Sequence, residues 1–369
     1  MANNSKTMYL CMHVLQVAPV SCINRDDTGT PKTCIYGGTS RMRVSSQCWK
    51  RAVRMYLKDK YGDTGVRTKF IIKTLADKLT DSGICDKETA SEFVKKWIGK
   101  AHIVSDDEGK KETSAFFSLE QINALSCLLN EYYSLEKERN ETEEDTEEAK
   151  KEKVKRENAF CKKLVDAVMD SPSASELLFG RMFASNPKLN YDAACQVAHA
   201  FSVNEVYEEP DYFTVVGDIK REEILSGSDY LDTKLFNSGI LYRFADVNLS
   251  EGSELRNEQY KVDAAKVCSN FIEAFVLSMP SGSANAYANM TLPEMVLIEL
   301  RDDIPVSFAP AFVKAVDGKD ICRTAMDTMV EYEEKVSRIY GEPIKKWVLG
   351  DVTLKELCLQ VEDEINRRL

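Results

Sequence analysis

The amino-acid sequence predicts an α+β protein in which one core, formed by both ends of the chain, is interrupted by a helical insertion. Two observations lead to this prediction. Segments with strand-like patterns occur near the N-terminus and return after residue 179, whereas the stretch from residue 58 to about residue 172 shows mainly helical patterns. Helical periodicity also dominates the last third of the chain, and the sequence contains no internal repeat.

The first elements are expected to be strands. Residues 8–18 alternate in polarity and are rich in Leu, Val, Tyr and Met, which favours a strand. Residues 33–36 and 40–44 flank Gly37 and Gly38, and this arrangement is typical of a hairpin with a tight turn.

A helix is expected to follow this hairpin directly. Either Ser45 or Ser46 is suited to cap its N-terminus through the side-chain hydroxyl. Apolar residues then recur at helical spacing and define one face of the helix. This face is predicted to contain Cys48, Trp49, Ala52, Val53, Tyr56 and Leu57.

The middle of the chain contains three further helical signals. Residues 68–79 and 87–98 are predicted helices. Ser118 and Gln121 have the spacing of a capping box, and we expect them to open a long helix that runs through Tyr133.

Residues 136–157 form a strongly charged segment. They include ten acidic residues, seven basic residues and no aromatic residue. Such a composition is typical either of a solvated helix or of a charged connector. A protein-only scaffold that uses this segment is therefore one alternative function for the chain.

The second half of the chain mixes both kinds of element. We predict a short helix over 192–201, an irregular acidic segment over 206–232, strands over 239–249 and 295–300, and helices over 258–277, 311–316, 323–340 and 353–368.

Composition excludes several classes of protein. The chain has 369 residues, of which 43% are hydrophobic and 30% charged, and this is typical of a globular protein. No apolar run approaches the ~20 residues that a membrane span requires. The first residues are polar, and His13 and Gln16 interrupt the first apolar stretch, so we expect no secretory signal and a cytoplasmic protein.

Cysteine and histidine patterns predict neither a metal site nor a disulfide scaffold. The eleven cysteines occur singly, without a Cys-x-x-Cys pair, and we expect reduced and mostly buried thiols. His13, His102 and His199 are isolated, and we expect His13 and His199 to be packing residues. Motifs typical of nucleophilic catalysis or of nucleotide binding do not occur, so we expect no cofactor and no enzymatic activity.

Residues 40–60 stand out by charge. This stretch contains seven basic residues and one acid, although the net charge of the whole chain is −11. Arg41 and Arg43 alternate on the predicted strand, which leads straight into a helix N-terminus. Helix N-termini and guanidinium groups both bind phosphate oxygens, so the stretch is a candidate backbone-binding site for nucleic acid. A solvated basic helix face is the other interpretation.

Three further features each allow two interpretations. Asp26 and Asp27 are either a metal-binding pair, as in a nuclease, or part of a turn in which one of them holds Arg25. Tyr212 and Phe213 are either a small core or a platform on which bases stack. The side chain of Met182, which follows Arg181, is either a core residue or an apolar wedge.

The order of several motifs resembles the CasC (Cse4-type) family, which forms the repeated backbone of the type I-E CRISPR Cascade surveillance complex. The N-terminal motifs are HVL (13–15), SCINRDD (21–27), IYGG (35–38) and RMRVSSQCWKRA (41–52). The later motifs are GRM (180–182), VAHA (197–200), YFTV (212–215), FNSG (236–239) and YRFADVNL (242–249). The resemblance is weak between residues 60 and 170 and at the C-terminus.

The resemblance implies a hand-like fold with an RRM-like (ferredoxin-like) palm, helical fingers and an extended, β-hairpin-like thumb. The implied boundaries are 1–57, 179–204 and 236–369 for the palm, 58–178 for the fingers, and 205–235 for the thumb.

The resemblance also implies a function and its residues. Copies of the chain are expected to stack along CRISPR RNA, to flip nucleotides at regular intervals, and to leave the guide free to pair with a target DNA strand alongside other Cascade subunits. The implied RNA contacts are Asn24, Arg25, Lys32, Arg43, Ser45, Gln47, Lys50, Arg51, Arg54, Arg181 and Met182. The implied thumb wedge is Tyr212, Phe213 and Thr214.

Two features depart from the family pattern. Residues 281–285 occupy a loop in which relatives often carry Lys or Arg, so no RNA contact is assigned to this loop. The charged segment at residues 136–157 has no counterpart to which it can be matched.

Overall fold

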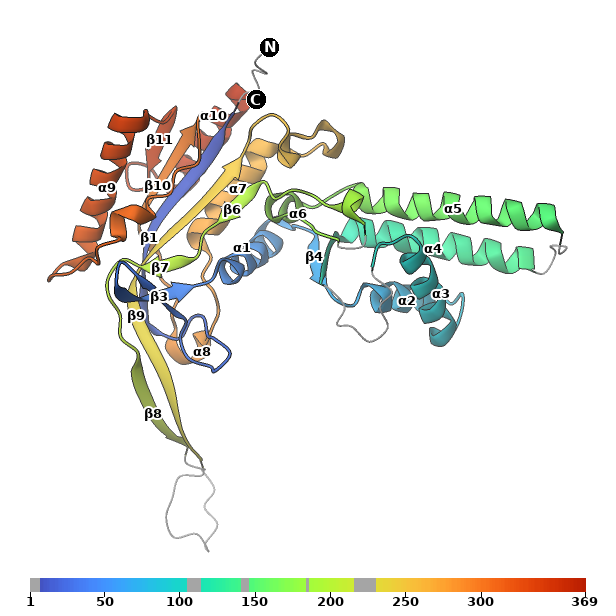
Figure 1. The fold of residues 1–369 in the computed structure, drawn as a ribbon, viewed down its shortest axis with the longest axis horizontal. Coiled ribbons are helices and arrows are strands. Elements are labelled where there is room, and N and C mark those ends of the chain that lie inside the picture. Colours follow the sequence, from blue (N-terminus) through green and yellow to red (C-terminus); the bar gives the residue numbers. More distant parts are fainter. Residues whose placement is uncertain (1–6, 105–113, 141–145, 184–185, 216–229) are drawn as a thin grey trace, which may run out of the picture. The chain divides into compact units, whose positions relative to one another are not determined.

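The computed structural model describes the chain as two compact units (Figure 1). The described residues are 7–104, 114–140, 146–183, 186–215 and 230–369. Unit 1 comprises Met1–Leu57, Cys195–Glu251 and Ala265–Leu369. Unit 2 comprises Lys58–Ala194 and Gly252–Ala264. Residues 179–194, which were expected in the palm, therefore lie in unit 2.

Unit 1 is built on a large antiparallel sheet. Its main path has the strand order β11-β10-β1-β9-β7-β3-β2, and β6 and β8 both pair with β9. The strands are β1 (Tyr9–Ser21), β2 (Thr33–Tyr36), β3 (Thr39–Val44), β6 (Cys195–Val197), β7 (Ala200–Ser202), β8 (Glu209–Val215), β9 (Tyr230–Asn248), β10 (Pro293–Arg301) and β11 (Lys345–Val348).

The strand β1 is an interior strand of this sheet. It pairs with β9 from Tyr9 opposite Asn248 onward, and with β10 from Tyr9 opposite Arg301 onward. Side chains on both faces of β1 are buried, because helices cover the sheet on both sides. The strand predicted over residues 8–18 is present, but its expected alternation in polarity is not, because burial on both faces favours an almost continuous apolar run.

Helices of unit 1 cover the two faces of the sheet. They are α1 (Ser46–Tyr61), α7 (Ala264–Leu277), α8 (Ala284–Tyr287), α9 (Ile321–Tyr340) and α10 (Leu354–Arg368). On one face, Leu15 packs with Phe308 and Met329 in a core that includes α9. On the other face, Trp49 of α1 packs with Met42 and Leu241, as the predicted apolar helix face required.

A two-stranded hairpin extends from the sheet (Figure 1). The strand β8 pairs only with the first residues of β9, from Glu209 opposite Phe236 to Val215 opposite Tyr230. Residues 206–232 were expected to be irregular, and this expectation was wrong for residues 209–215 and 230–232, which are strands, whereas residues 206–208 are irregular. The acidic segment forms a strand because it pairs with β9, and its local sequence gives no sign of this pairing.

Unit 2 is mainly helical. It contains α2 (Ile71–Asp81), α3 (Lys87–Lys100), α4 (Leu119–Asn140), α5 (Glu147–Met169), α6 (Ala174–Phe179), β4 (Gly65–Thr68) and β5 (Ala115–Ser118). The helices α4 and α5 lie side by side, and the rings of Tyr132 and Phe160 stack between them at 3.8 Å. The described parts of the charged segment are thus helical and belong to two helices, while residues 141–145 lie outside the described residues.

The helix start predicted at Ser118 was confirmed, whereas two predicted helices were wrong. Ser118 and Gln121 form the predicted capping box, with reciprocal bonds of 3.0 and 3.1 Å. The predicted helix over 192–201 was wrong, because β6 and β7 occupy this stretch and pair with β9. The predicted helix over 311–316 was also wrong, and a short 3-10 helix at Ala309–Phe312 is present instead.

Two absences concern the described part of the chain. No helix there combines the length and the apolar composition that a membrane span requires. The eleven cysteines, all of which are described, form no disulfide.

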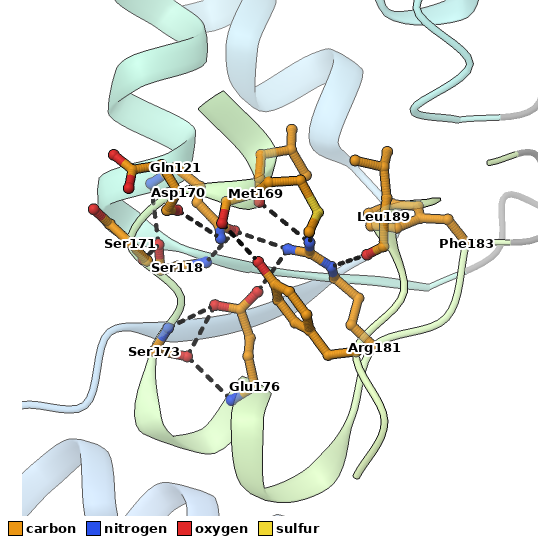
Figure 2. Close-up of polar contacts among 12 residues, drawn as sticks. Ser118, Gln121, Met169, Asp170, Ser171, Ser173, Glu176, Arg181, Phe183 and Leu189 are labelled. Atoms are coloured by element: carbon orange, nitrogen blue, oxygen red, sulfur yellow. Dashed lines mark hydrogen bonds and ion pairs between the residues drawn. The ribbon is translucent and has the colours of Figure 1, made fainter. Parts of the chain in front are cut away.

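A buried ion pair organises the junction between α4, α5 and α6 in unit 2 (Figure 2). Arg181 Nη1 lies 2.9 Å from Glu176 Oε1, and both side chains are fully buried. The same guanidinium donates to Gln121 Oε1 and to the carbonyls of Leu189 and Val168. Glu176 also accepts from the amide of Ser173, which caps α6. Both charged side chains of the pair therefore have further hydrogen-bond partners.

We expect Glu176→Gln to lower the free energy of unfolding by about 3 kcal/mol or more, because it leaves the Arg181 charge buried without a counter-charge. Denaturant unfolding followed by circular dichroism measures this loss. The double variant Glu176→Leu/Arg181→Met is expected to lose less than the sum of its single variants.

The exposed pair Arg323–Asp327 is the control for this experiment. Its removal is expected to cost about 0.5 kcal/mol or less, because solvent screens the two charges. Equal losses for the buried and the exposed pair would contradict the role assigned to Arg181.

Candidate nucleic-acid interface

The loop that follows β1 is organised by the carboxylate of Asp26. This carboxylate accepts from the amides of Thr28 and Thr30, at 2.9 and 3.0 Å, and from both of their hydroxyls, at 2.8 Å each. These hydrogen bonds hold the pKa of Asp26 down at about 2. The geometry is that of a turn, which leaves Arg25 exposed at the surface. Among the described residues, no group of three or more acidic, His or Cys side chains is placed to hold a metal ion.

Asn24 joins this loop to the start of α1. Its side-chain oxygen accepts from the amide of Ser45 at 2.9 Å, and its carbonyl accepts from the amide of Lys32 at 2.8 Å. The carbonyl of Lys32 in turn accepts from the amide of Arg43 at 2.8 Å. The loop, the end of β3 and the helix N-terminus are therefore held together as one surface.

The helix α1 begins as the sequence predicted. The hydroxyl of Ser45 accepts from the amide of Cys48 at 3.3 Å, so Ser45 is the N-cap. The turn before this helix also matches the prediction, since Gly37 and Gly38 have φ values of 60° and 84°. Positive φ at both central positions is typical of a type I′ hairpin turn, a conformation that glycine adopts without strain.

Polar and basic side chains form a stripe along α1. At 100° per residue, Gln47, Lys50, Arg51 and Arg54 lie within about one third of the helix circumference. The buried residues Trp49, Val53 and Leu57 form a second stripe, centred about 110° away around the helix. The four polar positions are partly or fully exposed. We call the surface formed by Asn24, Arg25, Lys32, Arg43, Ser45, Gln47, Lys50, Arg51 and Arg54 the basic track.

Arg41 does not belong to the basic track, although it alternates with Arg43. Its side chain is fully buried, and its guanidinium donates to the carbonyls of Ser202, Val203, Phe312 and Val313 at 2.6–3.3 Å. The expectation that both arginines lie on an accessible face was therefore wrong for Arg41, because a distant loop covers that end of the strand. Arg43 lies beyond this cover and is partly exposed.

The loop at residues 281–285 lies directly beside the basic track. A Cβ atom on Gly282 would stand only 1.9 Å from the carbonyl oxygen of Ile23, so the two backbones are in close contact. The side chain of Asn289 donates to the carbonyl of Gly282 at 3.2 Å and holds the loop in place. This loop therefore supports the Asn24 segment through its backbone.

The hairpin of β8 and β9 carries the predicted wedge residues. Tyr212 is 65% exposed, and Thr214 is exposed on the same face of β8. Phe213 lies on the other face, half-buried, with the Lys234 ammonium 4.8 Å from its ring centroid. Of the two wedge aromatics, Tyr212 therefore presents the larger exposed surface.

The two remaining predicted contacts belong to unit 2 and differ from each other. Met182 is 77% exposed, which suits contact with a ligand. Arg181 is buried in the ion pair described above, and the rings of Phe183 and Tyr191 also enclose its guanidinium. The Arg181 guanidinium therefore binds to groups within unit 2, and the expectation that Arg181 contacts RNA finds no support in the structure.

His199 is a residue whose placement the sequence did not reveal. We expected it to pack inside a helix, but it precedes β7 and is exposed, and its Nδ1 lies 3.1 Å from Arg43 Nη1. The pairing of Arg43 with Phe201 brings the two residues together, and no local pattern indicates this pairing.

We expect Asp26→Ala to loosen the loop after β1 without unfolding unit 1, because the four bonds to Thr28 and Thr30 are local. Hydrogen exchange at these two amides is expected to accelerate by about tenfold, as the loss of hydrogen bonding predicts. Asp27→Ala is the matched control, because the exposed Asp27 carboxylate makes none of these four bonds. The same acceleration in both variants would rule out the role of Asp26.

Comparisons with known proteins agree with the resemblance in the sequence. A chain described as "CRISPR RNA-guided surveillance complex, pre-nicking" matches with a TM-score of 0.78 and 29% identity, over 98% of this chain and 100% of that chain. A second, described as "CRISPR RNA-guided surveillance complex", matches with a TM-score of 0.67 and 26% identity, over 97% and 99% of the two chains. No curated protein matches the sequence.

A protein-family model also matches this chain. The model described as "CT1975-like protein" matches residues 10–365, which is nearly the whole chain. Together with the two structures, this match confirms the recognition of a CasC (Cse4-type) chain from its motifs. The chain belongs to the CT1975-like family.

Proposed function

We propose that this chain is a non-catalytic, RNA-binding backbone subunit of a type I-E CRISPR Cascade complex. The observation that carries the proposal is the basic track, in which a loop, a strand end and a helix N-terminus form one surface. Both structural relatives are described as CRISPR RNA-guided surveillance complexes, and they match this chain over nearly its full length.

The chemistry of the basic track suits a nucleic-acid backbone. Guanidinium and ammonium groups neutralise phosphates, while the N-terminal end of the α1 dipole attracts anions and the exposed Gln47 side chain donates hydrogen bonds. Contacts of this kind hold the backbone and leave base edges unread. The net charge of −11 restricts binding to this surface, because the rest of the protein repels nucleic acid.

The hairpin supplies the second part of the proposed mechanism. We assign Tyr212, Phe213 and Thr214 to a wedge that displaces one nucleotide at regular intervals along the RNA. Exposed aromatic rings gain about 1–3 kcal/mol for each base that stacks on them, which offsets the cost of unstacking. Met182 is the apolar contact that unit 2 contributes.

The remaining parts of the proposal concern assembly. Copies of the chain line up along CRISPR RNA in the cytoplasm and hold the guide so that it pairs with a target DNA strand. Sequence is then read by base pairing rather than by protein side chains. The sheet of unit 1 acts as an RRM-like palm, and the other Cascade subunits bind at the ends of the array.

We expect Lys50→Glu/Arg51→Glu to weaken RNA binding and to flatten its dependence on salt. Loss of two phosphate contacts reduces the slope of log K against log salt by about 1.4 for a single strand, because fewer counterions are released. Fluorescence anisotropy with a labelled guide RNA at several salt concentrations measures both quantities.

The matched control is Lys162→Glu/Lys163→Glu, which reverses two adjacent exposed lysines on α5. This variant is expected to keep the wild-type salt slope. If both double variants change the slope equally, binding depends on net charge alone and the basic track has no special role.

We also expect the hairpin to unstack RNA bases periodically. With 2-aminopurine placed at successive positions of the guide, fluorescence of the assembled complex should rise at regular intervals, since this base brightens when it is unstacked. Tyr212→Ala/Phe213→Ala is expected to remove these maxima. Tyr207→Ala, which deletes an exposed tyrosine outside β8, should leave them in place. A flat profile for the wild-type protein would rule out nucleotide flipping.

A further inference from the structure

His199 lies where three segments of unit 1 meet. It stands between β6 and β7, which both pair with β9, and it directly precedes Ala200, which pairs with Val44 of β3. Its ring is exposed, and it borders Arg43, a member of the basic track. The backbone around His199 is therefore fixed by the sheet, while its side chain faces the solvent.

The contact with Arg43 determines the protonation of His199. A guanidinium group only donates hydrogen bonds, so at 3.1 Å the Nδ1 atom must accept from Arg43 Nη1. The neutral ring then carries its hydrogen on Nε2. Arg43 itself is held in place, because its Nε donates to the carbonyl of Thr33 at 3.3 Å.

The charged groups around the imidazole favour this neutral form. Partial burial, Arg43 and Lys32 together lower the pKa of His199 below its ordinary value. Cys34, near Arg43, and Cys48, near Lys32, are neutral thiols, because burial raises the pKa of each.

The strand behind this cluster contributes two more ionisable residues. Arg243 and Asp246 lie on β9, and both side chains are buried. Burial lowers the pKa of Arg243 to about 9 and raises the pKa of Asp246 to about 7. The charged side chains that act on the exposed His199 imidazole are therefore those of Arg43 and Lys32, both of which are partly exposed.

We propose that Lys32, Arg43 and His199 together bind one phosphate of the RNA backbone, and that His199 takes up a proton when the phosphate binds. This inference rests on the RNA-binding function proposed above and adds a residue and a pH dependence to it. A proton from solvent adds to Nδ1, and Arg43 turns its Nη1–H from the ring to a phosphate oxygen. The phosphate charge then offsets the repulsion among three cations.

The coupling between phosphate binding and proton uptake determines how the RNA affinity changes with pH. In the free protein the pKa of His199 is lowered, and the bound anion raises it. RNA binding should therefore tighten as the pH falls through the interval between these two pKa values. The maximal gain is about tenfold in affinity per pH unit for each bound phosphate site.

The test measures affinity for a labelled single-stranded RNA between about pH 5.5 and about pH 8.5 at constant ionic strength, the range in which histidine titrates. We expect the wild-type protein to bind more tightly at low pH. His199→Gln should bind more weakly there and lose most of the pH dependence. His199→Lys should bind tightly over the whole range, because its charge is permanent.

The chain offers a matched control. His102→Gln removes an exposed histidine of unit 2 and should leave the pH profile unchanged. Burial lowers the pKa of His13 to about 3, so this histidine does not titrate in the measured range. The buried acids Asp246 and Glu299, with pKa values raised to about 7, titrate equally in all variants and cancel in the comparison.

The outcomes separate the two proposals. If the wild-type protein fails to bind RNA at every pH, the proposed function is wrong. If it binds and His199→Gln reproduces its affinity and pH profile, the function stands and the role of His199 is overturned. An equal loss of affinity at every pH in His199→Gln would overturn the proton uptake.

Discussion

The position of β1, paired with β9 on one edge and with β10 on the other, is the constraint on which the rest of unit 1 depends. The end of β1 delivers the segment that carries Asn24, and β9 continues outward as one strand of the hairpin. The Asn24 side chain then fixes the start of α1 through Ser45. One pairing pattern therefore places both the basic track and the hairpin that carries Tyr212.

Arginine serves two opposite purposes in this protein. Arg41, Arg181 and Arg243 are buried, and carbonyls, a carboxylate or aromatic rings surround their guanidinium groups. Arg25 and Arg43 instead reach solvent on the basic track. A short motif such as Gly-Arg-Met gives no indication of which kind an arginine is, because the partners that bury it come from distant segments. This is why the motif-based assignment of Arg181 to RNA binding found no support.

Sequence reasoning succeeded where the physics is local. The turn at Gly37, the cap at Ser45 and the apolar face around Trp49 all depend on neighbours within a few residues. It failed at residues 192–201, where pairing with β9 outweighs the helical pattern, and it missed β11, whose partner is β10. The basic track was partly visible as a charge excess at residues 40–60. His199 was hidden because its partner, Arg43, lies 156 positions away.

The length of β9 has a mechanical consequence. Its 19 residues span ~60 Å at the usual rise of a strand. Its first part belongs to the hairpin, and the remainder is clamped between β1 and the short strands β6 and β7. The base of the hairpin is tightly confined, because a Cβ atom on Gly239 would stand only 3.0 Å from Ser202 Cβ and 3.2 Å from Val206 Cγ1. A displacement of the hairpin therefore acts on the same strand that pairs with β1, and the end of β1 leads directly into the loop that carries Asn24.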